Sequence, residues 1–259
     1  MPMTRLVDLS KDVEITHTDH QYQWSSIYQI GGLAAIGAVL VGVSEIVITF
    51  LPGGNVPRET VLEWFQLFQE NSFMGLRNLG LLNIMLNTLA ILIFLALYAA
   101  HRQSQDQPYA ALAALIALLG IGVFYANNRA FPMLALSHQY AAATTDAQRT
   151  VIEAAGQAML SVGKSHSPGT FLGFFLVELA GVMMAVVTLR SKIFSTASAW
   201  AGMLGFGVLA IFEFFTSFVS GLDNVAMTLA VFGGLLSMAW YILIARRLFQ
   251  LGRNPITRL

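Results

Sequence analysis

Residues 31–50 read GGLAAIGAVLVGVSEIVITF, and this stretch decides the class of fold. Its only ionisable side chain is Glu45, and glycine, alanine and branched apolar residues make up nearly all the rest. An α-helix rises about 1.5 Å per residue, so about 20 residues cross the ~30 Å hydrocarbon core of a bilayer. The stretch therefore predicts a transmembrane helix.

The whole chain has the composition of a membrane protein. Of its 259 residues, 56% are hydrophobic and only 11% are charged, whereas soluble domains carry about 25% charged residues. Apolar runs of similar length lie near residues 29–51, 76–100, 109–126, 168–189, 198–220 and 224–245. We therefore expect an all-α, polytopic membrane protein built as a bundle of six transmembrane helices.

Net charge and cysteine content exclude some function classes. The formal net charge is zero, which gives no reason to expect nucleic acid as a partner. The chain has no cysteine, which excludes disulfides, thiolate metal sites and cysteine nucleophiles. The partners we expect are the lipid bilayer and a small or lipid-like ligand, and no residue pattern indicates a particular cofactor.

The first long link, residues 52–75, predicts a short amphipathic helix over about 59–71. Val61, Trp64, Phe65 and Phe68 fall on one face of that helix. A short helix with one apolar face is typical of a segment at the membrane interface.

The second long link, residues 130–167, predicts another amphipathic helix over about 145–163. Thr145 and Gln148 fit a capping box at its start. Small and apolar residues then recur at helical spacing, namely Ala147, Val151, Ala154, Ala158 and Val162. We expect this helix to lie on the bilayer or over the bundle.

Lysine and arginine residues predict the orientation. One set lies in the tails and short links: Arg5, Lys11, Arg102, Arg190, Lys192, Arg246, Arg247, Arg253 and Arg258. A smaller set belongs to the two long links: Arg58, Arg77, Arg129, Arg149 and Lys164. Because short cytoplasmic links are enriched in positive residues, both termini are expected in the cytoplasm. The chain then divides into a polar cytoplasmic tail (1–27), a transmembrane domain (28–248) and a basic cytoplasmic tail (249–259).

Several polar side chains interrupt the spans, and their helical faces predict that they point into the bundle. Glu45 lies on a stripe of small residues, which allows helices to pack closely; the stripe contains Gly31, Ala35, Ala38, Gly42 and Thr49. Three other faces are Arg77 with Gly80, Asn83 and Asn87; Asn127 with Ala113, Ala117 and Gly120; and Glu178 with Gly181 and Ala185.

The depth of these groups predicts a cavity. At about 1.5 Å per residue, nearly all of them fall in the outer half of the bundle, and the inner half is almost purely apolar. We expect a polar cavity that opens to the outer face, with Asn87 and Glu178 at its floor. The candidate ligand-binding residues are Glu45, Arg77, Asn83, Asn87, Asn127, Arg129, Glu178 and Glu213.

The same residues can instead have purely structural roles. Glu45 and Glu213 can form ion pairs with Arg77 and Arg129, asparagines can bridge helices, and a terminal arginine can anchor its span at the interface. Three buried carboxylates need such partners, a bound cation or protons.

Metal binding has little support in the sequence. His138 and His166 are weak candidate ligands on the outer side, but no metal-binding spacing is present. Ser165 and His166 precede the fourth span, where such residues more often form a helix-start loop than a catalytic pair.

The outer segment at 131–160 reads FPMLALSHQYAAATTDAQRTVIEAAGQAML and precedes an apolar span with an interior glutamate. Over roughly residues 30–245 the chain resembles a bacterial and archaeal family of six-span integral membrane proteins described only as a domain of unknown function. The resemblance implies a six-helix membrane fold in the cytoplasmic membrane of a prokaryote. It implies no activity and no catalytic residue.

Three functions are compatible with this pattern. The first is the binding or transport of a small cationic or amphipathic ligand in the outer cavity. The second is a membrane-embedded hydrolase that uses Glu178 or Glu213 as acid or base. The third is a scaffold or stress-response component in which the polar groups only fix the packing. The sequence alone leaves open whether the protein is an enzyme.

Overall fold

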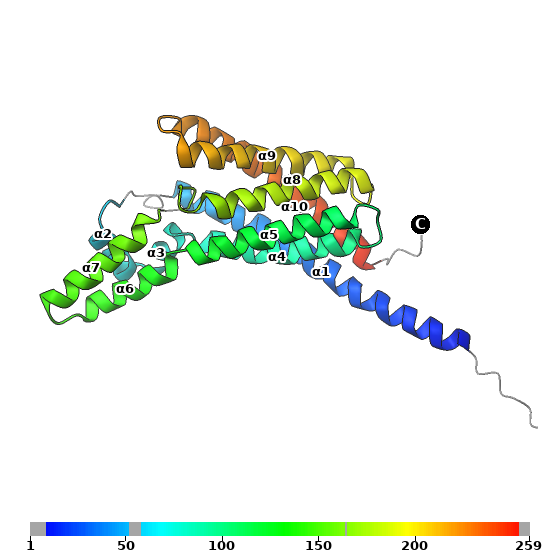
Figure 1. The fold of residues 1–259 in the computed structure, drawn as a ribbon, viewed down its shortest axis with the longest axis horizontal. Coiled ribbons are helices and arrows are strands. Elements are labelled where there is room, and N and C mark those ends of the chain that lie inside the picture. The colour runs from blue at the N-terminus through cyan, green and yellow to red at the C-terminus, as the bar shows by residue number, and fades with distance from the viewer. Residues whose placement is uncertain (1–8, 52–57, 164, 254–259) are drawn as a thin grey trace, which may run out of the picture.

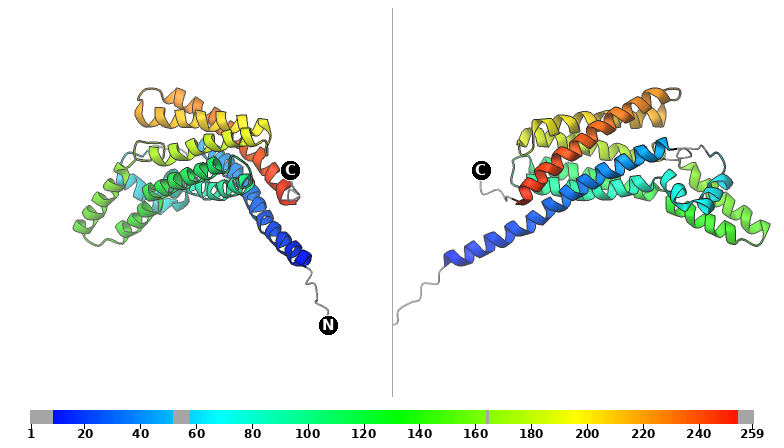
Figure 2. Two further views of the ribbon diagram at one scale, coloured as in Figure 1. Left: turned by 45° about the vertical axis from the view of Figure 1, so that its right-hand side comes forward. Right: turned by 180° about the vertical axis from the view of Figure 1, so that it is seen from behind.

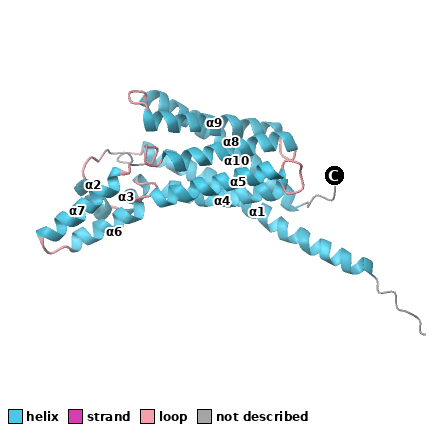
Figure 3. Ribbon diagram, viewed as in Figure 1, coloured by secondary structure: helices cyan, strands magenta, loops and turns pink. Residues whose placement is uncertain are grey.

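The computed structural model describes residues 9–51, 58–163 and 165–253. These residues form ten helices and no strand (Figure 3). Six candidate spans are long and apolar enough to cross a membrane, which confirms the expected all-helical bundle. The spans lie in α1 (Leu9–Phe50), α4 (Leu81–His101), α5 (Gln107–Asn127), α8 (Phe171–Ser191), α9 (Thr196–Phe218) and α10 (Asp223–Arg253). The third candidate continues past α5 to Ala142.

The six long helices pack in a closed ring that follows chain order. α1 packs on α4, α4 on α5, α5 on α8, α8 on α9 and α9 on α10, and α10 returns to pack on α1 (Figure 1). Each helix therefore has two main neighbours and a third face left for lipid. Large apolar side chains such as Leu33, Leu115 and Phe232 are more than half exposed, as expected of side chains that face the bilayer.

Small residues set the distance between neighbouring helices. A Cβ atom added to Gly120 of α5 would lie 2.9 Å from the carbonyl oxygen of Gly173 on α8. On α1, Ala35 and Ala38 are fully buried, which confirms that the small stripe of the first span faces protein. Close approach of backbones through small residues is the usual way in which membrane helices pack.

Four short helices form a compact unit at one end of the bundle, which we call the cap: α2 (Val61–Glu70), α3 (Ser72–Asn78), α6 (Ala130–Ala142) and α7 (Asp146–Ser161). Both views in Figure 2 show the cap at one end of the bundle, with the start of α1 and the end of α10 at the opposite, terminal end. The two long links therefore lie on one side of the bundle.

The apolar face that the sequence predicts for α2 is buried, and it packs against another part of the protein. Val61, Trp64, Phe65 and Phe68 pack with Met133 of α6 in the core of the cap. The buried Ser137 hydroxyl of α6 donates to the Phe65 carbonyl at 2.9 Å. The apolar face of α2 is therefore covered by α6, and the position of α2 at the membrane interface stays a prediction.

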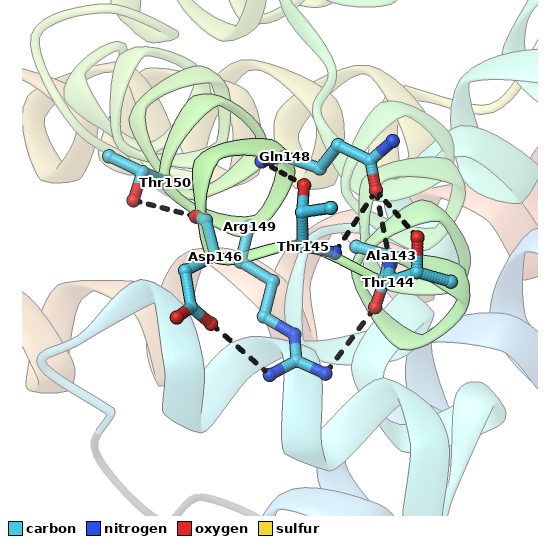
Figure 4. A network of polar contacts seen from close by, with 7 residues as sticks. All are labelled: Ala143, Thr144, Thr145, Asp146, Gln148, Arg149 and Thr150. Atoms are coloured by element: carbon cyan, nitrogen blue, oxygen red, sulfur yellow. Dashed lines mark hydrogen bonds and ion pairs between the residues drawn. The ribbon is translucent and has the colours of Figure 1, made fainter.

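The start of α7 confirms the predicted capping box. The Thr145 hydroxyl accepts from the Gln148 backbone N–H, and the Gln148 carboxamide oxygen accepts from the Thr144 and Thr145 backbone N–H groups (Figure 4). Arg149 closes the turn by donating to the Ala143 carbonyl (Figure 4). These bonds satisfy backbone donors that the first turn of a helix leaves free.

The face of α7 that helical spacing indicates does not pack on the rest of the protein. Val151 is 69% exposed, and Ala154 and Ala158 are exposed as well. The neighbouring face packs on the cap instead, through the buried Gly156 and the partly buried Ile152. Gly156 contacts Val61 and Phe65 of α2. The face of α7 that becomes buried is therefore the one that can approach α2 closely, and helical periodicity alone does not identify it.

The second span begins later than its apolar pattern predicts. α3 ends at Asn78, and Gly80 adopts a left-handed conformation with φ of 102° before α4 starts at Leu81. A glycine tolerates this backbone geometry without steric cost. Arg77 therefore lies on α3 in the cap, and the face that we expected it to share with Asn83 and Asn87 does not exist.

Candidate functional site

The register of α8 and α9 brings two glutamates toward each other. The rings of Phe171 and Phe218 lie 4.8 Å apart, and Gly181 contacts Phe206 further along the same pair. This antiparallel register puts Glu213 about one helical turn, ~5 Å, nearer the cap than Glu178. Side chains lean toward the N-terminus of their own helix, so the Glu178 and Glu213 carboxylates converge.

Both carboxylates are buried and incompletely bonded. Glu178 is 7% exposed and Glu213 is 0% exposed. Within the described residues, each carboxylate has one buried oxygen, Oε2, with no hydrogen-bond partner. The register of α8 and α9 puts the two groups within about one helical turn of each other along the bundle. Two like charges in a poorly solvated site need a proton or a cation between them.

His166 covers this pair from the cap side. It lies in the link between α7 and α8, and its Nδ1 makes a short contact with Glu213 Oε1. The imidazole lies against two rings, with centroid distances of 4.4 Å to Phe174, on which it is stacked, and 5.0 Å to Phe212. Its backbone has φ of 60°, a left-handed conformation that a non-glycine residue adopts at some cost.

The same link is attached to the start of α4. Asn83 Nδ2 donates to Ser165 Oγ at 3.2 Å, and Ser165 also lies against Gly80. Asn87, one turn further along α4, is buried and uses its side chain amide on the Asn83 carbonyl at 2.9 Å. Asn83 therefore contacts the link over the site, whereas the hydrogen bond of Asn87 stays within its own helix.

Glu45 does not belong to this site. It forms an ion pair with Arg77 at 2.7 Å, and its side chain is 44% exposed while that of Arg77 is 4% exposed. Arg77 also donates to the Glu45 carbonyl and to the Thr49 hydroxyl. The expected single cavity with three glutamates is therefore wrong, because the break before α4 moves Arg77 beside α1. The pair fastens α3 to α1.

The polar end of α5 has a structural role. Asn128 donates to the Leu79 carbonyl at 3.2 Å and accepts from the Ala130 backbone N–H at 3.0 Å. Arg129 donates to the Ala126 carbonyl at 3.2 Å. These bonds end one helix and begin the next. Asn127 is partly buried at the last position of α5, and Arg129 is not an ion-pair partner of Glu213.

The two histidines named as metal candidates lie in different environments. His138 is exposed on α6, whereas His166 is stacked on Phe174 and contacts Glu213. Across the described residues, no three side chains of His, Cys, Asp and Glu come together in a geometry that could hold a metal ion.

Sequence reasoning missed two features. The first is the contact of His166 with Glu213, since the sequence indicates His166 only as a weak metal ligand in the loop before the fourth span. The second is the polarity of the terminal half of the bundle, where His101, Thr188 and Ser198 are buried. The expectation of an almost purely apolar inner half is therefore wrong. Single serine, threonine and histidine residues within apolar runs were the available signal.

No family model, curated protein or solved structure matches the chain.

Proposed function

We propose that the protein binds a small organic cation between Glu178 and Glu213, as a receptor or carrier in the membrane. The observation that carries the proposal is the pair of buried carboxylate oxygens, one on each glutamate, without a hydrogen-bond partner among the described residues. Ionisable groups inside a membrane bundle are costly and mark ligand or ion sites more often than they serve packing alone.

The surroundings of His166 favour an organic cation over a metal ion. Its imidazole occupies a slot between the rings of Phe174 and Phe212, and its Nδ1 points to Glu213. Aromatic faces with a carboxylate at the end are the chemistry that recognises ammonium groups. A ligand cation can replace the imidazole in the slot, so His166 acts as an internal occupant that closes the site.

We further propose that the cap faces the outside of a prokaryotic cytoplasmic membrane and that both termini are cytoplasmic. The support is the charge distribution in the sequence, with the larger set of lysines and arginines at the terminal side and in short links. With this orientation, the ligand reaches Glu213 from outside the cell, past His166.

The binding of tetramethylammonium to the purified full chain tests the proposed site. We expect Glu178→Gln and Glu213→Gln each to weaken binding by about 10- to 100-fold, because a charge-assisted contact contributes ~1.5–3 kcal/mol. His166→Ala should strengthen binding, since it removes the occupant of the slot. Glu153→Gln on the exposed surface of α7 is the matched control. Equal binding by all four variants and the wild type contradicts the proposal.

One observation favours a second function, a membrane-embedded hydrolase. The contact of Glu213 with His166 resembles the way in which a carboxylate orients a catalytic histidine. Ser165 and Ser167 flank this histidine in the sequence. Labelling by a fluorophosphonate that is lost in both Ser165→Ala and His166→Ala supports a hydrolase. Absence of labelling in the wild type removes this alternative.

A further inference from the structure

The terminal end of the bundle is strongly basic. Its cationic side chains lie at the ends of α4 and α8 and on the last two turns of α10 (Figure 1): Arg102, Arg190, Lys192, Arg246, Arg247 and Arg253. Among the side chains that the structure describes at this end, Asp106 is the one carboxylate, and it pairs with Arg190 at 3.1 Å. The described residues therefore leave most of this positive charge without a counter-charge.

The link between α8 and α9 holds one of these cations in a fixed place. Arg247 Nε of α10 donates to the Ile193 carbonyl of the link at 2.8 Å. The next residue, Phe194, is buried and stacks on the ring of His101. Lys192 precedes these two anchored residues, has φ of 57° and is exposed. Lys192 is therefore displayed at the surface on a turn that two other helices hold.

The same bond brings the end of α10 to the link. Arg246, next to the anchoring Arg247, is exposed. The side chains of Lys192 and Arg246 form no hydrogen bond or ion pair within the described residues. Arg190 uses its Nε on Asp106, and its side chain is still more than half exposed. We call the cations around this link the basic patch: Arg190, Lys192, Arg246 and Arg247.

Exposed aromatic side chains lie at the level of the patch. Tyr109, on the first turn of α5, is half exposed, and the guanidinium carbon of Arg190 lies 5.3 Å from its ring centroid. Trp200, just over one turn into α9, is also half exposed. Tyrosine and tryptophan are enriched where membrane spans meet the lipid headgroups. The cations of the patch therefore lie where the phosphates of the bilayer lie.

An apolar track runs from the patch along α9. Leu204 and Ile211 lie on the same helical face as Trp200, and each is about half exposed. A molecule with a phosphate in the patch and an acyl chain along this track contacts both. A soluble anion uses only the cations, so the track favours a lipid as the occupant.

We propose that the basic patch binds the headgroup phosphate of anionic phospholipids. Ammonium and guanidinium groups bind phosphate oxygens through charge-assisted hydrogen bonds, and Lys192 and Arg246 have all their side chain donors available. The cytoplasmic leaflet carries a negative surface potential, which agrees with the orientation proposed from the charge distribution. The patch lies at the opposite end of the bundle from the cap, so the inference does not depend on the proposed cation site.

Competition between two lipids tests the inference. Native mass spectrometry counts the lipids that the full chain retains from micelles with equal amounts of dioleoyl phosphatidylglycerol and dioleoyl phosphatidylcholine, which differ only in the headgroup. We expect the wild type to retain more phosphatidylglycerol. Lys192→Gln and Arg246→Gln should each lower the ratio of the two lipids by about fivefold, the usual contribution of one basic residue at an anionic surface. Lys192→Arg keeps the charge and should retain the ratio.

The matched control is Arg149→Gln, which removes an exposed cation from α7 in the cap and should leave the ratio unchanged. Equal retention of the two lipids by the wild type overturns the inference. An equal fall of the ratio in the Lys192, Arg246 and Arg149 glutamine variants overturns it as well. Inorganic phosphate at the concentration of the lipid should displace no phosphatidylglycerol. Displacement by phosphate assigns the patch to a soluble anion and overturns the assignment to lipid.

Discussion

The three glutamates inside the spans have three different surroundings, and the differences follow from their neighbours. Glu45 lies against a buried guanidinium, Glu213 against an imidazole, and Glu178 has no hydrogen bond among the described residues. The small-residue stripe was enough to predict that Glu45 faces protein. The ion pair with Arg77, one of the structural roles that the sequence allowed for Glu45, is confirmed, whereas the place of Arg77 on α3 depends on the left-handed turn at Gly80.

Loss of the Glu45 charge should destabilise the junction of α1 and α3. We expect Glu45→Gln to lower the free energy of unfolding by about 1 kcal/mol, since the half-exposed carboxylate is screened by solvent but the guanidinium of Arg77 is buried. Thermal unfolding in detergent micelles measures the change. Glu153→Gln, the same substitution at an exposed position of α7, should leave unfolding unchanged. Equal shifts for the two variants contradict this role.

The capping box of α2 should make the cap sensitive to acid. The Glu63 carboxylate accepts the backbone N–H groups of Glu59 and Thr60, and these bonds lower the pKa of Glu63 below its ordinary value of 4.5. A lowered pKa in the folded state stabilises the fold above pH 4.5, and this stabilisation is lost as the pH falls through the lowered pKa.

Amide hydrogen exchange in α2, corrected for the intrinsic pH dependence, measures this effect. Exchange at the first turn of α2 should accelerate as the pH falls below 4.5, and Glu63→Gln should remove the acceleration because glutamine does not titrate. Acceleration that persists in the glutamine variant assigns the acid sensitivity to another group.

Among whole elements, hydrophobic length predicted the long helices, and turn residues decided where they end. The six apolar runs identify the spans because only helices satisfy their own backbone in lipid. The ends of α3 and α5 depend instead on Gly80 and on the side chain bonds of Asn128. The face that α7 buries depends on where α2 packs. The residue spacing within α7 gives no information about that position.

The α5–α8 contact should not tolerate a side chain at Gly120. A methyl group there would lie 2.9 Å from the Gly173 carbonyl oxygen, and backbone cannot move aside cheaply. We expect Gly120→Ala to destabilise the fold by about 1–3 kcal/mol, the usual cost of overpacking. Gly122→Ala, on the same helix with no atom near the added methyl, is the control. Thermal unfolding that is equal in the two variants contradicts the close packing.

The link over the site should control access to it. The chain has no cysteine, so Asn83→Cys with Ser165→Cys introduces a single reactive pair where the two side chains are in contact. Bridging the pair with dibromobimane should abolish tetramethylammonium binding, because His166 then stays in its slot. The unreacted double variant and each single variant should still bind. A bridged chain that binds as well as the unreacted one assigns access to another route.

At the scale of the whole molecule, the ring of six helices places a buried glutamate pair beneath the link between α7 and α8, at the end of the bundle that carries the cap. The ring follows chain order, so each connection is short except the two that build the cap. The sequence predicted the number of spans and Glu178 and Glu213 as candidates. It did not predict that they converge, since this requires the register between α8 and α9.

The central claim is that a cation binds between Glu178 and Glu213. An infrared difference spectrum of the full chain in lipid, recorded before and after addition of tetramethylammonium, tests it most directly. The account predicts loss of protonated carboxyl absorption and gain of carboxylate absorption, because the cation replaces a proton held between the two side chains. Both bands should vanish in the double variant Glu178→Gln, Glu213→Gln and persist in Glu153→Gln. Carboxyl bands that do not change when the wild type binds the probe would contradict the claim.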